Sequence, residues 1–346
     1  MRSLNSDLAH EIDLTVSFKT MSLIPSEQWL SEVKNADYIL TVLAPELSDA
    51  DIDAVSQLLV EQGLMIKNKA RLTGLPVSVA HENLASRACV QLTLTGQLID
   101  AQVTRQALLA LSQQRQIDLA LQSSTAYCQP RRLICFDMDS TLIGQEVIDE
   151  LAKEAGVGEQ VAEITERAMQ GELDFQASFR ARVALLKGMD ASVLASIAER
   201  LTINEGAAHL ISTLKLMGYR TAILSGGFQY FAEYLQMKLG LDEVHANILD
   251  IQDGVVTGEV KGDIMDGARK ALFLGKIAEE MGISLEQTVA VGDGANDLPM
   301  LGLAGLGVAY HAKPLVRQTA QQAISNIGLD GVLYLLGVHA EEIHAL

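Results

Sequence analysis

The chain has 346 residues, of which 49% are hydrophobic and 20% are charged, and its net charge is −18. This length has room for two or three domains, and this composition is typical of a well-packed globular protein. The acidic excess excludes nucleic acids and anionic membrane surfaces as expected partners, because both bind clusters of Lys and Arg.

The cysteines and the apolar runs predict a cytoplasmic protein. Cys89, Cys128 and Cys135 form no C-x-x-C pair, so neither a disulfide framework nor a zinc site is expected. We find no signal peptide at the N-terminus and no apolar run long enough to span a membrane.

Residues 36–124 are expected to form a domain of their own, after an N-terminal extension at 1–35 to which the sequence assigns no role. The apolar spacing predicts, in order, a strand at 38–43, a helix from Ser48 to Gly63, strands at 64–72 and 89–94, a helix from Asp100 through Leu111 and a strand at 117–121. This β-α-β-β-α-β order is the ferredoxin-like α+β arrangement.

The same order resembles the ACT-type regulatory domains that are attached to amino-acid enzymes. ACT-like ligand sites usually have a glycine in the first strand-to-helix loop, whereas this loop reads Ala44-Pro45-Glu46-Leu47. Two roles therefore stay open for this domain: a structural or dimerising one, which would give a homodimer, and a sensor for a small molecule.

Residues 125–346 alternate short strands with helices, which predicts an α/β domain with a doubly wound parallel sheet. After a polar linker at 122–132, strands are expected at 133–136, 221–224, 288–292 and 306–309, a hairpin at Asp253-Gly254, and helices after 227 and at 266–282. Four further helical patterns, at 146–156, 161–171, 173–188 and 191–201, follow the first of these strands. They predict a small four-helix insert at about 145–203 that covers the strand ends as a cap.

Two carboxylates stand at the end of the strand at 133–136. Side chains alternate along extended backbone, so Asp137 and Asp139 can face the same side. Open α/β sheets place their chemistry at this end of the strands. Like charges this close repel each other unless they share a proton or a cation lies between them, and the natural cation for oxygen ligands here is Mg²⁺. A plain acidic turn is the alternative.

Three later segments carry polar groups that could converge with this pair. Ser225-Gly226-Gly227 follows a strand and precedes a helix, which suits a phosphate oxygen, although it could be only a flexible turn. Lys270 could neutralise phosphate charge or could be an exposed helix lysine. The acidic residue in Gly292-Asp293-Gly294-Ala295-Asn296-Asp297 lies at a strand end between two glycines, which suits metal ligation better than a plain loop.

These segments occur in the order of the motifs of the haloacid-dehalogenase-like (HAD) phosphatases, and within that superfamily they are similar to those of the phosphoserine phosphatases. The resemblance covers roughly residue 132 to the C-terminus. It implies a Mg²⁺-dependent enzyme that hydrolyses O-phospho-L-serine in the last step of serine biosynthesis. The alternatives are another small phosphomonoester, phosphoryl transfer to an amino-acid alcohol, and, from a different class, an amino-acid sensor with a vestigial phosphatase fold.

The resemblance also implies a role for each matching residue. Asp137 is the nucleophile that becomes an aspartyl phosphate, and Asp139 is the acid and then the base. The metal would be held by the Asp137 side chain, the Asp139 backbone carbonyl and Asp293. Further positions would bind the phosphoryl group (Ser225, Gly226, Lys270, Asn296), hold the substrate from the insert (Glu146, Met169, Phe175, Arg182) or support the site (Thr141, Gly227, Asp297). Glu146 would pair with the substrate ammonium and Arg182 with its carboxylate.

Overall fold

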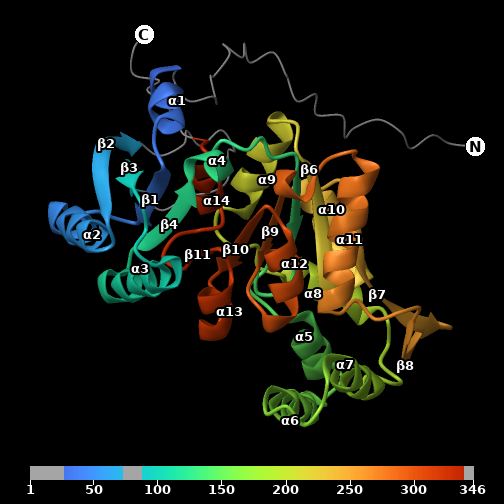
Figure 1. Cartoon of the computed structure of the whole chain (residues 1–346). Coiled ribbons are helices and arrows are strands. Elements are labelled where there is room, and N and C mark those ends of the chain that lie inside the picture. The colour runs from blue at the N-terminus through green and yellow to red at the C-terminus, as the bar shows by residue number, and fades with distance from the viewer. Residues whose placement is uncertain (1–26, 73–87, 339–346) are drawn as a thin grey trace, which may run out of the picture.

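Two β-sheets form the framework of the molecule (Figure 1). The computed structural model describes residues 27–72 and 88–338, so most of the predicted N-terminal extension lies outside the described residues. One sheet has four strands in the order β2-β3-β1-β4, and the other has seven in the order β11-β10-β9-β5-β6-β7-β8.

The elements of the four-stranded sheet lie where the sequence predicts them. They are β1 (Tyr38–Ala44), α2 (Asp49–Glu61), β2 (Leu64–Leu72), β3 (Ala88–Gly96), α3 (Ala101–Arg115) and β4 (Asp118–Ser123), and the paired strands are antiparallel. Both helices begin at the predicted caps. Ser48 forms a capping box with Asp51, and the Asp100 carboxylate accepts hydrogen bonds from Gln102 N and Val103 N at 2.8 and 2.9 Å.

The prediction of a linker at 122–132 was wrong for its first half. Gln122 and Ser123 belong to β4, and helix α4 (Ser124–Tyr127) follows directly. The Ser123 hydroxyl caps this helix by accepting a hydrogen bond from Ala126 N at 3.2 Å. Tyr127 then packs with α1 (Glu27–Lys34), a helix that was not predicted.

The predicted parallel sheet is confirmed, with β5 at its centre. Its strands are β5 (Leu133–Phe136), β6 (Arg220–Phe228), β7 (Glu243–Gln252), β8 (Val255–Lys261), β9 (Thr288–Gly292), β10 (Leu306–Tyr310) and β11 (Gln322–Ile324). Only β8 runs antiparallel to its neighbour, in the hairpin predicted at Asp253-Gly254, where both turn residues have positive φ.

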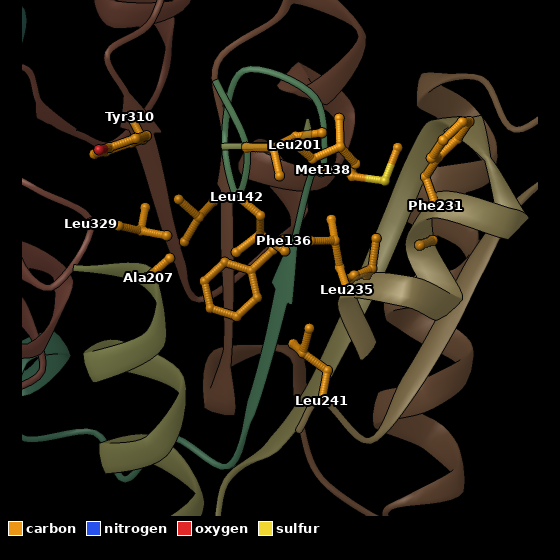
Figure 2. Close-up of a cluster of buried hydrophobic side chains, with 14 of the residues drawn as sticks. Phe136, Met138, Leu142, Leu201, Ala207, Phe231, Leu235, Leu241, Tyr310 and Leu329 are labelled. Carbon is orange, nitrogen blue, oxygen red and sulfur yellow. The ribbon is translucent and has the colours of Figure 1, made fainter. Parts of the chain in front are cut away.

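The central strand β5 serves two hydrophobic cores because its side chains alternate between the sheet faces. Ile134 and Phe136 pack toward α9 (Ala207–Leu216), α10 (Gln229–Leu239) and α14 (Gly331–Leu335). Figure 2 shows Phe136 among the side chains of this core, with Leu235 and Leu142 beside it. Leu133 and Cys135 pack on the other face with α11 (Gly267–Glu280), α12 (Leu298–Leu303) and α13 (Pro314–Thr319). Complete burial of each large apolar side chain contributes about 1.5–3 kcal/mol.

Four short helices stand between β5 and α9: α5 (Val147–Glu154), α6 (Gly158–Met169), α7 (Phe175–Ala184) and α8 (Val193–Arg200). In Figure 1, α5, α6 and α7 project beyond one end of the seven-stranded sheet. The hairpin β7–β8 holds the connection between α7 and α8. Gly188 N donates to Val256 O at 2.9 Å, and Ala191 N donates to Gly254 O at 2.8 Å. Of the helices in the described ranges, none combines the length and apolar character needed to cross a membrane.

The two sheets are joined by buried polar contacts. The Asp118 carboxylate on β4 is 2% exposed and accepts hydrogen bonds from Ser325 N and Asn326 N at 2.8 and 3.0 Å. Gln91 and Gln122 donate to the carbonyls of Tyr334 and Leu335 in α14, at 3.1 and 3.0 Å. Because a buried polar group without a partner is costly, these bonds favour one orientation of the sheets.

Candidate active site

A buried lysine joins two strand ends of the seven-stranded sheet. Asp137 follows β5, and the 3₁₀ helix at Ala295–Asp297 follows β9, its parallel neighbour. Lys270 Nζ lies 2.8 Å from Asp137 Oδ1 and 2.7 Å from Asp297 Oδ1, and the lysine side chain is fully buried. Burial alone would lower the pKa of Lys270, but the two carboxylates outweigh it and raise that pKa. Lys270 is therefore a fixed positive charge beside Asp137 and not an exposed helix lysine.

A third carboxylate, that of Asp293, lies close to those of Asp137 and Asp297. Oxygen atoms of Asp137, Asp293 and Asp297 all lie within 4.8 Å of one another, which is the spacing of a metal site. Burial and the Asp297 carboxylate raise the pKa of Asp137, against the opposing effect of Lys270. Burial, with Asp297 and Glu146, raises the pKa of Asp293 to about 7. Lys270 pairs with Asp137 and Asp297, so the three carboxylates together carry excess negative charge, and this cluster fits a hard cation with oxygen ligands.

The loop after β5 brings the predicted residues around Asp139 together. The backbone turns at Ser140, whose φ is 55°, and Leu142 N and Ile143 N both donate to Met138 O. Asp139 Oδ1 accepts from Val147 N at 3.3 Å, at the start of α5. Ser140 Oγ donates to Glu146 Oε1 at 2.8 Å, and Thr141 Oγ1 donates to Asp293 Oδ1 at 3.2 Å. One short loop therefore positions Asp139, Glu146 and Asp293.

The Ser225-Gly226-Gly227 segment continues β6 in extended form and passes close to Asp139. A Cβ atom on Gly227 would lie 2.6 Å from Asp139 Oδ2 and 2.7 Å from Met138 Cε, so a larger residue would displace these side chains. The backbone of this segment is held from β7, because Asn247 Nδ2 donates to Gly226 O at 2.8 Å. Ser225 is fully buried, and its hydroxyl accepts from Gly227 N at 2.8 Å.

These strand ends and the insert enclose one cavity of about 270 Å³. Of the predicted site residues, those that line it are Asp137, Asp139, Glu146, Phe175, Arg182, Gly226, Gly227, Asp293 and Asn296. Ser225, Lys270, Thr141 and Asp297 do not line it but contact residues that do. Met169 is the last residue of α6, and its side chain lies outside what the structure describes.

The insert contributes one cation and an aromatic wall to this cavity. The Arg182 guanidinium on α7 is half-buried, and burial lowers its pKa although Asp149, Glu146 and Asp139 oppose that effect. Phe175 and Phe179 stack with ring centroids 6.2 Å apart, and Phe228 lies 5.7 Å from Phe179. The cavity thus combines charged side chains with apolar rings, and such rings limit the access of water.

Sequence reasoning missed several contributors to the site. Lys313, directly before α13, lines the cavity and is a second cation at the strand ends. Asp149 and Thr165 line it from α5 and α6. Lys313 follows the predicted strand at 306–309 by only a few residues, and that spacing was the one available signal. Asn247 left no signal, since it lies in the middle of a strand.

Comparison with known proteins agrees with this geometry. The family model described as haloacid dehalogenase-like hydrolase matches residues 131–305, about half of the chain. The chain belongs to this family. A phosphoserine phosphatase of Streptomyces coelicolor is 43% identical over 307 residues, which cover 89% of this chain and 72% of that protein. HAD phosphatases use a metal ion, and the acidic cluster of Asp137, Asp293 and Asp297 could hold one.

Two solved structures are also similar to this chain. The unliganded crystal structure of a probable phosphoserine phosphatase from Vibrio cholerae is 37% identical, with a TM-score of 0.69, and covers 88% of each chain. A phosphoserine phosphatase solved as a substrate-bound complex is 45% identical, with a TM-score of 0.56, and covers 60% of this chain and 98% of that one. The first likeness therefore extends over both sheets, and the second over a smaller part of the chain.

Proposed function

We propose that this chain hydrolyses O-phospho-L-serine to L-serine and phosphate through an aspartyl phosphate on Asp137. The observation that carries the proposal is the single cavity of about 270 Å³ in which Asp137 and Asp139 lie with Glu146 and Arg182 of the insert region. The two aspartates are the groups proposed for phosphoryl transfer. Glu146 and Arg182 match the ammonium and the carboxylate of an α-amino acid. The relatives named as phosphoserine phosphatases support the same substrate.

In the proposed first step, an Asp137 carboxylate oxygen attacks phosphorus while the bond from phosphorus to the serine oxygen breaks. Asp139 gives its proton to the leaving serine oxygen. In the second step, Asp139 takes a proton from the water that attacks the aspartyl phosphate, which restores Asp137 and releases phosphate. Such acid and base assistance is worth roughly 10²–10⁴ in rate. Lys270, 2.8 Å from Asp137, stabilises the negative charge that builds up on the phosphoryl oxygens.

We propose Mg²⁺ as the metal, held by the Asp137 and Asp293 side chains and the Asp139 backbone carbonyl. Carboxylate and carbonyl oxygens are the ligands that this ion prefers. When bound, it supplies positive charge that favours ionised Asp137 and offsets charge on the phosphoryl group. Asp297 is better placed as a support, since its two oxygens already accept hydrogen bonds from Lys270 Nζ and Gly294 N at 2.7 and 2.9 Å.

The division of the chain into domains is part of the same proposal. Residues 36–124 would form an ACT-like domain and residues 125–346 the HAD domain, with a helical cap at about 145–203. The sheet order β2-β3-β1-β4 supports the first and the position of α5–α8 supports the cap. The cysteines are free thiols, which supports a cytoplasmic enzyme, and a homodimer through the ACT-like domain remains part of the proposal.

The substrate test compares phosphate release from phosphoserine, phosphothreonine and a panel of sugar phosphates with Mg²⁺ present. We expect phosphoserine to have the highest kcat/KM, because only an α-amino acid offers both an ammonium to Glu146 and a carboxylate to Arg182. A sugar phosphate that exceeds phosphoserine would refute the proposed substrate.

Removal of the Arg182 guanidinium should damage substrate recognition more than chemistry. We expect Arg182→Ala to reduce kcat/KM for phosphoserine by roughly 10–100-fold, since a lost charged hydrogen bond costs about 1.5–3 kcal/mol. Hydrolysis of an aryl phosphate, which has no carboxylate, should change little. Arg180→Ala is the matched control, because Arg180 is exposed on the same helix and does not line the cavity. Equal losses on both substrates would mean that Arg182 supports the fold instead.

Metal binding should stabilise the folded chain as well as permit turnover. At a Mg²⁺ concentration 100 times the dissociation constant, linkage predicts about 2.7 kcal/mol of added stability. We expect thermal melting to shift upward with Mg²⁺, to return with a chelator, and to respond much less in Asp293→Asn. A melting temperature of the wild-type chain that does not change with Mg²⁺ would contradict this assignment.

A further inference from the structure

A second cavity lies between the two sheets, away from the site described above. It has a volume of about 350 Å³ and is lined by α3 and β4 on one side and by residues from β10, β11 and α13 on the other. In Figure 1, α3 and α13 lie near each other, in agreement with the lining of this cavity. We call this cavity the interdomain cleft. Clefts between domains are preferred positions for small-molecule sites.

The walls of the interdomain cleft are fixed relative to each other. Gln322 Nε2 on β11 donates to Leu121 O on β4 at 2.8 Å, which ties the two walls directly. The Asp118 carboxylate, with its bonds to Ser325 N and Asn326 N, holds β4 against the segment after β11. Because hydrogen bonds hold the two walls together, the cavity exists before a ligand binds. Binding therefore does not carry the cost of ordering these walls.

Each wall contributes one arginine for which the described residues offer no acidic partner. Arg105 on α3 and Arg317 on α13 both line the interdomain cleft and are half-buried. Within residues 27–72 and 88–338, neither guanidinium forms an ion pair or donates a hydrogen bond, and the Nε of Arg317 is buried without an acceptor. By contrast, Arg115 on the same helix as Arg105 lies 3.6 Å from an oxygen of Asp51.

The other residues that line the interdomain cleft restrict which kinds of ligand it can bind. Among the residues that the structure describes, no Asp or Glu lines the interdomain cleft, although the chain has 44 acidic against 26 basic residues. An ammonium group would therefore meet two cations and no anion there. The rest of the surface is largely apolar, with Leu98, Leu108 and Leu119 among its members. Burial lowers the pKa of Arg105, and a bound anion would offset that penalty on the charged form.

We propose that the interdomain cleft binds a small organic anion, a carboxylate or a phosphate-type group on an apolar body, between Arg105 and Arg317. The two planar guanidinium groups engage the anionic head, and the leucines contact the apolar part. The site selects against zwitterionic α-amino acids, since it has no carboxylate for their ammonium. It does not depend on the proposed phosphatase activity.

The test is calorimetric titration of the full-length chain with benzoate and with phenylphosphonate, which share an apolar ring and differ in the anionic head. We expect at least one of them to bind, and Arg105→Gln/Arg317→Gln to weaken that binding tenfold or more. The control Arg115→Gln/Arg180→Gln removes the same charge outside the cleft and should bind as the wild type does. The head group that binds more tightly identifies the ligand class, and L-serine should not bind in the cleft.

Three results would overturn the proposal. The first is no binding of either anion to the wild-type chain. The second is equal affinity in the wild type and in Arg105→Gln/Arg317→Gln, which would place the anion in the catalytic cavity. The third is L-serine binding that the double substitution abolishes. Each single substitution, Arg105→Gln and Arg317→Gln, is titrated too, with thermal melting to show that the variants are folded.

Discussion

Asp137→Asn is expected to remove turnover almost completely, with kcat lowered by roughly 10⁴–10⁶, as for the loss of other enzymatic nucleophiles. An amide cannot attack phosphorus to form the aspartyl phosphate. The same change relieves repulsion, because Asp137 is buried beside Asp293 and Asp297 and shares one lysine with the latter. We therefore expect an inactive variant whose melting temperature without metal equals or exceeds that of the wild type.

The measurement combines phosphate release with thermal melting in the presence of a chelator. Asp53→Asn is the control, since Asp53 is exposed on α2 and does not line the cavity. It should retain most of the activity. Turnover within tenfold of the wild type in Asp137→Asn would refute the covalent mechanism. An unfolded variant would refute the claim that the substitution relieves repulsion between buried carboxylates.

Lys270→Ala is expected to lower both activity and stability. It leaves two carboxylates, those of Asp137 and Asp297, buried near each other without their shared cation. Breaking a buried charge pair in this way costs about 3–5 kcal/mol. Loss of one charge-stabilising donor also lowers kcat by roughly 10²–10³.

Urea unfolding without metal, together with steady-state kinetics, checks both effects. Lys276→Ala is the matched control because Lys276 is an exposed lysine on the same helix α11. Its free energy of unfolding should stay within about 0.5 kcal/mol of the wild-type value. If Lys270→Ala is as stable as Lys276→Ala, the carboxylates must be neutral in the folded chain and the charge assignment is wrong.

Much of the parallel sheet could be predicted because its strands are short apolar runs that end in polar residues. Helix α9 was missed for the opposite reason: Ala207, His209, Leu210 and Thr213 are all buried, so the helix has no polar face to reveal its period. Strand β11 has only three residues, too few for a pattern. Local periodicity identifies an element only when one of its faces meets water.

The candidate site shows a similar division. Asp137 and Asp293 could be found because each follows a predicted strand. The partner of Lys270 could not be fixed from spacing, since Lys270 and Asp297 are 27 residues apart and meet only through packing of α11 against the sheet. Lys313 and Asn247 were missed because their contribution depends on how neighbouring strands align. Sequence patterns locate reactive groups at strand ends, whereas the tertiary structure selects their supports.

The contacts that form the catalytic cavity and join the two sheets connect segments that are far apart in the sequence. Thr141 and Asp293, which meet in the catalytic cavity, are separated by 152 positions, and Asp118 and Ser325, which join the sheets, by 207. Contacts of such long range form slowly, because a large loop must close before they can stabilise it. A growing chain can form the four-stranded sheet early, but β9, β10 and β11 all emerge late. The enzyme therefore acquires its catalytic centre only near the end of its own synthesis. Until then, not all of the strands and helices that cover the apolar side chains of β5 have been synthesised.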